Sequence, residues 1–190
     1  MRVEAVSTSR PKGDARVGGP GESSGGPSRK IVVGIDPGTA ITGYGVVESK
    51  PDGGVTLLEC GVIRTSSSEP LPLRIREIFE GIREIIHRFR PWAVAVEDVF
   101  QGKNVRSALT LGHARGAILL AAALDDLTIA EYSPREIKSA VVGTGNATKD
   151  QVGYMVQRHL RLKSPPTPPD AADGVAAALC HLLVSSSPSI

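Results

Sequence analysis

Apolar and polar positions divide the chain into short strand-like runs and longer helical stretches. Apolar runs bounded by turn residues predict five strands, at residues 30–36, 42–48, 55–65, 92–97 and 128–132. The first and fourth runs are apolar at almost every position, which is typical of strands buried on both faces. Turn residues (PDGG) occupy 51–54, so the first three strands are predicted to form an antiparallel meander.

Two longer stretches carry helical patterns. Apolar residues recur at steps of three and four between residues 70 and 90, and this spacing predicts an amphipathic helix. A second helix is expected over 105–124, which is rich in alanine. Gly112 and Gly116 lie four positions apart in it and allow close backbone approach, either within the core, which we expect, or between two subunits.

The C-terminal third of the chain carries helix start signals. Ser133 and Thr148 each begin a capping box, so two further helices are predicted to start there. The prolines between 165 and 169 argue against a helix in that segment. We expect Asp170 to be the N-cap of a last helix that ends at Leu183.

This order of elements predicts one α/β domain, a five-stranded mixed sheet with helices on both faces. We place the domain at residues 30–184. Of the 29 residues before it, 14 are Gly, Pro or Ser, so residues 1–29 are predicted to be a disordered tail. Residues 185–190 are expected to be a frayed C-terminus.

Composition narrows the class of protein. Hydrophobic residues make up 41% of the 190 positions and charged residues 22%, as in ordinary globular domains. No apolar run is long enough for a membrane span, and the first residues lack the apolar segment of a secretory signal. Cys60 and Cys180 are too few for a disulfide framework or a four-cysteine zinc site. We expect both to be buried thiols in a reducing compartment, the cytoplasm.

The net charge of the chain does not indicate a protein that binds polyanions. The formal net charge is +2, and residues 1–29, with five basic and three acidic side chains, account for all of it. Residues 30–190 hold 17 basic and 17 acidic side chains. Binding to nucleic acid would therefore depend on local clustering of charge.

Four acidic residues stand where strands end or a helix begins. Asp36 ends the first strand, Glu97 ends the fourth, and Asp170 and Asp173 share one face of the last helix. If the first and fourth strands are parallel neighbours, their carboxyl ends meet at one edge of the sheet. Carboxylates that converge without basic partners repel each other, and Mg²⁺ relieves this repulsion because it prefers oxygen ligands. Taken singly, each acid also has an ordinary structural role as a turn cap, a solvated strand end or a helix cap.

Four segments carry a resemblance to a known family. They are DPGTAITGYGVVE (36–48), VEDVFQGKNVRSALTLGHARG (96–116), SPREIKSAVVGTGNATKDQV (133–152) and DAADGVAAAL (170–179). In this order and spacing the chain resembles, from residue 30 to 183, the RuvC family of bacterial Holliday-junction endonucleases in the RNase H-like superfamily. The resemblance implies an RNase H-like fold and paired, symmetric nicks in a four-way DNA junction. These nicks leave 5′-phosphate and 3′-hydroxyl ends.

The resemblance also implies cofactors and partners. The family's four metal-binding acids match Asp36, Glu97, Asp170 and Asp173, which would hold two Mg²⁺ ions per subunit, with Mn²⁺ a plausible substitute. Members of the family work as homodimers beside the RuvA–RuvB branch-migration complex. Two other classes of function stay open from the residues alone. One is a phosphotransferase of the sugar-kinase type, and the other is a junction-binding module without activity.

Candidate DNA contacts surround the acidic residues. The resemblance matches Lys138, Lys149 and Phe100 to functional positions of the family. Phe100 lies in a polar loop with Lys103, where an aromatic ring can stack on an unpaired base or anchor the loop to the core. Lys103 and Arg106 are expected to contact phosphates.

Overall fold

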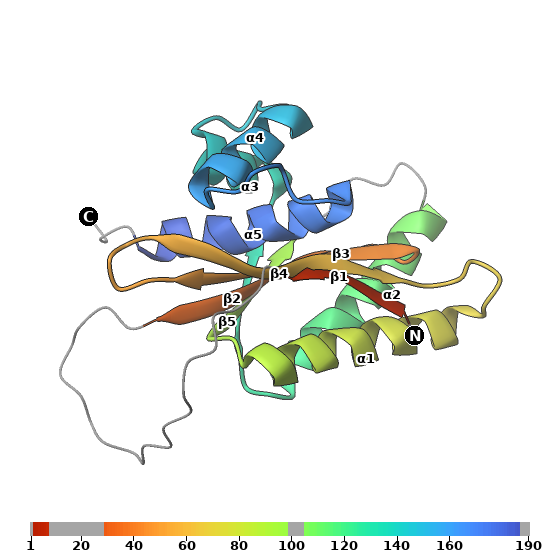
Figure 1. Cartoon of the computed structure of the whole chain (residues 1–190). Helices are drawn as coiled ribbons and strands as arrows, with labels where there is room; N and C mark the ends of the chain where they lie inside the picture. The colour runs from red at the N-terminus through yellow and green to blue at the C-terminus, as the bar shows by residue number, and fades with distance from the viewer. Residues whose placement is uncertain (1, 8–28, 99–104, 187–190) are drawn as a thin grey trace, which may run out of the picture.

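A six-stranded sheet lies between two layers of helices in the computed structural model, which describes residues 2–7, 29–98 and 105–186 (Figure 1). The strands are β1 (Arg2–Ser7), β2 (Lys30–Asp36), β3 (Ile41–Ser49), β4 (Val55–Arg64), β5 (Ala93–Glu97) and β6 (Thr128–Tyr132). Their order across the sheet is β1-β4-β3-β2-β5-β6. Strands β2, β3 and β4 form an antiparallel meander, and β5 and β6 run parallel to β2.

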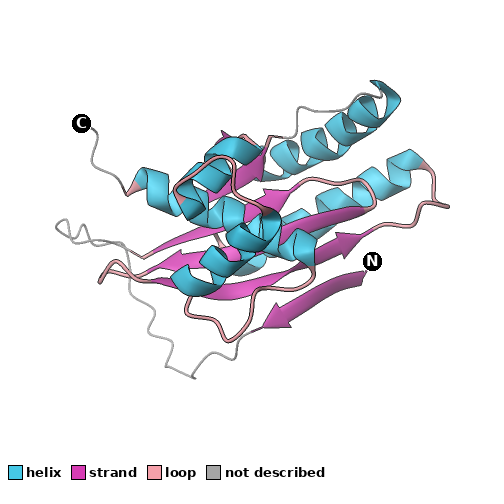
Figure 2. Cartoon of the chain, turned by 90° about the horizontal axis from the view of Figure 1, so that it is seen from above, coloured by secondary structure: helices cyan, strands magenta, loops and turns pink. Residues whose placement is uncertain are grey.

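The helices cover both faces of this sheet. On one face lie α1 (Leu71–Phe89) and α2 (Val105–Ala123). On the other lie α3 (Pro134–Val142), α4 (Lys149–His159) and α5 (Pro169–Ser185), with α5 directly against the strands (Figures 1 and 2). None of the helices in the described ranges is long and apolar enough to cross a membrane.

Alternate residues of the central strands fill two separate hydrophobic cores. Val32 of β2 and Ala95 of β5 pack in the core below α5, whereas Val33 and Val96 pack against α1 and α2. This alternation follows from the two-residue period of an extended strand. It explains why the runs in β2 and β5 are apolar at nearly every position.

Helix α5 touches the backbone of the sheet because glycines face it. A Cβ added to Gly34 would lie 2.1 Å from the carbonyl oxygen of Gly174, and one added to Gly43 would lie 1.9 Å from that of Asp170. No larger residue fits at either position without a shift of the backbone. The first turn of α5 is therefore held directly over β3.

The predicted fold class is confirmed, and the five predicted strands are all present. The structure adds β1, which pairs antiparallel with β4 at the edge of the sheet. For residues 2–7 the prediction of a disordered tail is therefore wrong. Apolar and charged residues alternate in their sequence (RVEAVS), and the Gly, Pro and Ser content of the whole segment obscured this pattern. Residues 8–28 lie outside the described residues, and for them disorder stays a prediction.

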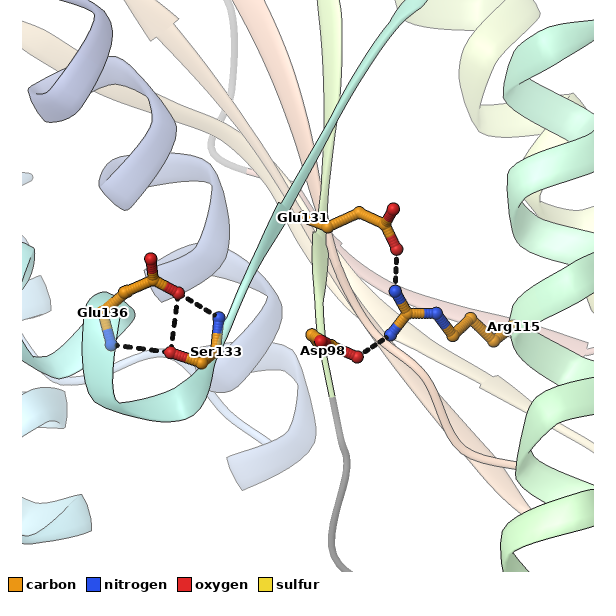
Figure 3. Close-up of polar contacts among 5 residues, drawn as sticks. All are labelled: Asp98, Arg115, Glu131, Ser133 and Glu136. Atoms are coloured by element: carbon orange, nitrogen blue, oxygen red, sulfur yellow. Dashed lines mark hydrogen bonds and ion pairs between the residues drawn. The ribbon is translucent and has the colours of Figure 1, made fainter.

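Both capping boxes are confirmed. The Ser133 side chain accepts a hydrogen bond from the backbone N–H of Glu136, whose carboxylate accepts one from the N–H of Ser133 (Figure 3). Thr148 begins α4 in the same way. The prediction that Asp170 is an N-cap is wrong, because the N-cap of α5 is Pro168, two residues earlier, and Pro169 is the first helical residue. A proline is accommodated there because its missing N–H would have no partner in the first turn.

Two further expectations concern small residues. Cys60 and Cys180 are both buried free thiols, as predicted. The core-packing role expected for Gly112 and Gly116 is wrong, because a Cβ added to either meets no atom within 4 Å. Both glycines face open space on α2.

We predict that Gly43→Ala destabilises the protein by about 1–3 kcal/mol, because the new methyl group forces α5 away from β3. Gly153→Ala in α4 is the matched control, since its Cβ would make only an ordinary contact of 3.9 Å with Pro165. Chemical denaturation of both variants tests this. Equal stability of the two would contradict the close approach of α5.

Candidate active site

The ends of two neighbouring strands place two acids side by side. β2 and β5 are parallel, with Ile35 opposite Val96, so Asp36 and Glu97 follow at the same edge of the sheet. Both acids belong to the alternate set of residues that faces α5, because Val32 and Ala95 of that set pack there. The sequence-based expectation that these two acids meet is confirmed.

The N-terminal end of α5 brings the third and fourth acids to this edge. Asp170 and Asp173 lie in the first turns of the helix, and the backbone of Asp170 lies directly above Gly43 of β3. A cavity of about 280 Å³ opens between the strand ends and helices α3, α4 and α5. Its polar lining consists of Asp36, Glu97, Asp173, Lys138 and Lys149, and its apolar wall of Pro134, Ile137, Val152 and Ala176.

The electrostatics of the cavity show that the four acids form one cluster. The pKa of the Asp36 carboxyl is raised to about 7, first by its burial and then by the negative charges of the other three acids. Burial and the charge of Asp173 raise the pKa of Glu97 to about 6. Shifts of this kind are characteristic of functional sites, because a fold gains no stability by crowding like charges.

Two lysines supply the opposing charge. Lys149 Nζ donates a hydrogen bond of 2.9 Å to Asp173 Oδ2, and this bond raises the pKa of the lysine. The Lys149 side chain is 79% exposed, against 24% for Asp173, so its ammonium reaches in from solvent. The charges of Lys149 and, to a smaller extent, Lys138 lower the pKa of Glu97 and partly offset its burial.

The donor set suits a hard divalent cation. Carboxylate oxygens are the ligands that Mg²⁺ prefers, and a cation would relieve the mutual repulsion of the acids. As the side chains stand, no group of three or more His, Cys, Asp or Glu in the described ranges is arranged to hold a metal ion. Side-chain movements would be needed to close a coordination shell.

The loop after Asp36 is held by three residues that the sequence analysis did not identify. Thr42 donates to the carbonyl of Gly38 at 2.6 Å, and Thr65 donates to that of Thr39 at 2.6 Å. Arg74 of α1 donates to the Thr39 carbonyl at 2.7 Å and to the Thr65 hydroxyl at 3.0 Å. Nothing in the local sequence of Arg74 signals this role, because its partners are 9 and 35 residues away.

Only two of the five residues predicted to contact DNA are found at the acidic cavity in the described part of the chain. Lys138 and Lys149 line the acidic cavity, as expected. Arg106 lies in the first turn of α2 and is not among the residues that line the cavity. Phe100 and Lys103 lie outside the described residues, so their roles stay predictions.

A mixed sheet with acidic residues at its parallel strand ends and on the helix above them defines the RNase H-like class of metal-dependent nucleases. Comparison with known proteins identifies the family. The family model for crossover junction endodeoxyribonuclease RuvC matches residues 32–181, and the chain belongs to this family.

Relatives and solved structures agree with this assignment. The crossover junction endodeoxyribonuclease RuvC of Shewanella pealeana is 51% identical over 157 residues, which is 83% of this chain and 89% of the relative. That of Desulforamulus reducens is 45% identical over 162 residues, 83% of this chain and 96% of the relative. Thermus thermophilus RuvC, solved in complex with a Holliday junction substrate, superposes with a TM-score of 0.78 at 40% identity, covering 82% of this chain and 94% of that one.

A more distant structure supports the fold alone. The yeast mitochondrial Holliday junction resolvase Ydc2 superposes with a TM-score of 0.62 at 14% identity, covering 80% of this chain and 77% of that one.

We predict that Asp36→Asn stabilises the metal-free protein above pH 7. Because the pKa of Asp36 is higher in the folded than in the unfolded chain, the wild type loses stability as pH rises from about 4 to about 7. The amide does not ionise, so the variant avoids this loss, on the order of 1–3 kcal/mol. Unfolding measured with a chelator present at pH 4 and pH 8 tests this prediction. A variant that is no more stable than the wild type at pH 8 would refute the electrostatic cluster.

Proposed function

We propose that the chain resolves Holliday junctions by paired, symmetric nicks, hydrolysing phosphodiester bonds to 5′-phosphate and 3′-hydroxyl ends. The observation that carries this proposal is the electrostatic cluster of four carboxylates, three of which line one cavity together with two lysines, in a chain of the RuvC family. The similar Thermus thermophilus protein was solved with a Holliday junction substrate, which supports this choice of substrate. Such DNA lies in the cytoplasm of bacteria, where we place the protein.

The four acids would hold two Mg²⁺ ions, with Mn²⁺ able to replace them. Bound there, the ions would supply Lewis-acid activation of water and stabilisation of the leaving oxygen. Asp36 lies at the centre of the electrostatic cluster and would hold the ions together with Glu97, Asp170 and Asp173.

Lys149 would exchange partners when substrate binds. Its ammonium neutralises Asp173 in the structure described here. A cation at the carboxylates would remove the need for this contact, and the flexible, largely exposed lysine could then contact a phosphate of the cleaved strand. Lys138, across the cavity, is suited to a second phosphate contact.

The rival functions are less well supported. A phosphotransferase of the sugar-kinase type normally combines two domains of this fold, and the family match is to a nuclease. A binding module without activity would gain nothing from four carboxylates near phosphates, since they repel the DNA backbone.

We also propose a homodimer through α2. Val105, Leu109 and Leu120 expose 74%, 62% and 53% of their surface, and Gly112 and Gly116 lie open between them on the same helix. An apolar face with small residues at its centre allows a second helix to approach closely. A two-fold dimer would present one catalytic cavity to each of two strands of a junction. Partnership with the RuvA–RuvB complex is implied only by the family resemblance and stays a prediction.

We predict that Asp36→Asn abolishes nicking of a four-way junction in Mg²⁺ but leaves junction binding intact or slightly tighter. The change removes a ligand charge and a source of repulsion toward phosphate while keeping the size of the side chain. Gel-based nicking and binding assays test it, with Asp52→Asn in the β3–β4 turn as the matched control. Ca²⁺ in place of Mg²⁺ should give the same behaviour in the wild type, because its longer and looser coordination favours binding without turnover. Cleavage by Asp36→Asn at a near-normal rate would exclude this carboxylate as a metal ligand.

We predict that Leu109→Glu shifts the protein from dimer to monomer, because a charge on the α2 face is costly to bury. Sedimentation analysis measures the mass. Leu73→Glu on α1, where the leucine is 38% exposed, is the control and should remain dimeric. Unchanged mass of both variants would locate the interface elsewhere.

A further inference from the structure

Glu97 and Asp98 are adjacent acids that leave β5 on opposite faces of the sheet. Val94 and Val96 pack against α1 and α2, whereas Ala95 packs below α5. By this alternation Glu97 projects into the acidic cavity and Asp98 projects toward α2. The two carboxylates therefore have different surroundings despite being neighbours in the sequence.

Arg115 of α2 bridges Asp98 to β6. One nitrogen of its guanidinium contacts Asp98 Oδ1, and the other contacts Glu131 Oε2 (Figure 3). The Arg115 side chain is only 21% exposed, so these contacts are partly shielded from solvent. The N–H of Asp98 also donates a 2.7 Å hydrogen bond to the carbonyl of Tyr132. The end of β5 is thus fixed to β6 through the backbone and to α2 through a side chain.

Only an arginine suits this position. The fork of the guanidinium reaches two carboxylates at once, whereas a lysine ammonium is a point charge on a flexible stem. Without Arg115, Asp98 would carry an unpaired negative charge one residue from Glu97, beside the four clustered acids. The strand end would also lose its tether at the residue that directly follows Glu97.

We infer that Arg115 is a positioning residue for the catalytic centre. By holding Asp98 on the α2 face, it keeps the end of β5 in place, and with it Glu97 aligned beside Asp36. Arg115 is not among the residues that line the acidic cavity, so its effect on the site would pass through the strand that carries Glu97. This inference rests on the proposed function, in which Glu97 is a metal ligand.

Arg115→Ala should lower the cleavage rate at saturating junction about 10–100-fold and raise the Mg²⁺ concentration for half-maximal cleavage, as supporting residues of metal sites do. The affinity for the junction in Ca²⁺ should change less than about two-fold, because no phosphate contact is lost. The midpoint of the Mg²⁺-dependent rise in melting temperature should move to higher concentration, and this readout does not depend on turnover.

Asp98→Asn isolates the same contact with a smaller change. It should shift the Mg²⁺ midpoint in the same direction, and the double variant with Arg115→Ala should be no worse than Arg115→Ala alone. If Arg115→Ala does not fold, Asp98→Asn alone tests the inference through the Mg²⁺ midpoint.

Arg83→Ala is the matched control. Arg83 of α1 pairs with Asp125 at 3.6 Å, and both side chains are 27% exposed, but this pair does not line the acidic cavity. The control should keep the wild-type rate and Mg²⁺ midpoint.

Equal behaviour of Arg115→Ala and Arg83→Ala, or additive effects in the double variant of Arg115→Ala with Asp98→Asn, would overturn the inference. Absence of Mg²⁺-dependent cleavage in the wild type would instead refute the proposed function, and a shifted thermal midpoint would still support the role of Arg115.

Discussion

The close approach of α5 to the sheet is the constraint on which the site depends. Gly34 and Gly43 leave no side chain between helix and strands, so the backbone of α5 lies directly on β2 and β3. This contact sets the height of Asp170 and Asp173 above the strand ends that carry Asp36 and Glu97. Asp36 and Asp170 are more than 130 positions apart in the sequence, and they meet because this close packing fixes where α5 lies on the sheet. The same contact builds the larger of the two hydrophobic cores, so packing and site geometry cannot vary independently.

The acidic cluster works against the stability of the fold that holds it. Burial and mutual repulsion raise the pKa values of Asp36 and Glu97, and a lysine is drawn in from solvent to neutralise Asp173. Ionised at neutral pH, these groups cost free energy that the two cores must offset. When a cation is bound, the same carboxylates become its ligands and contribute favourably to the free energy of folding. Proteins commonly accept local strain of this kind where activity requires it.

The sequence predicted the features that local patterns encode. Five strands follow from short apolar runs, the starts of α3 and α4 from capping boxes, and the meeting of Asp36 and Glu97 from strand order. It failed where local signals compete or are absent. Pro169 is the first residue of α5, where a proline is tolerated, although the run of prolines argued against a helix there. The exposed glycines of α2 have the same sequence pattern as glycines that pack in a core. Arg74 and Arg115 could not be found, because their partners lie on other elements and only the folded chain brings them together.

Strand β1 forms the edge of the sheet beside β4, whereas the five-stranded prediction left β4 as the edge strand. It pairs with β4 from Arg2↔Arg64 to Ser7↔Glu59, and so occupies hydrogen-bonding groups that would otherwise face solvent along a strand of ten residues. An unpaired strand of that length, which contains the buried residues Val62 and Ile63, is a template for strands of other molecules. The edge strand is instead β1, which is six residues long, and this shorter edge offers fewer backbone groups for pairing with another molecule than the ten residues of β4 would.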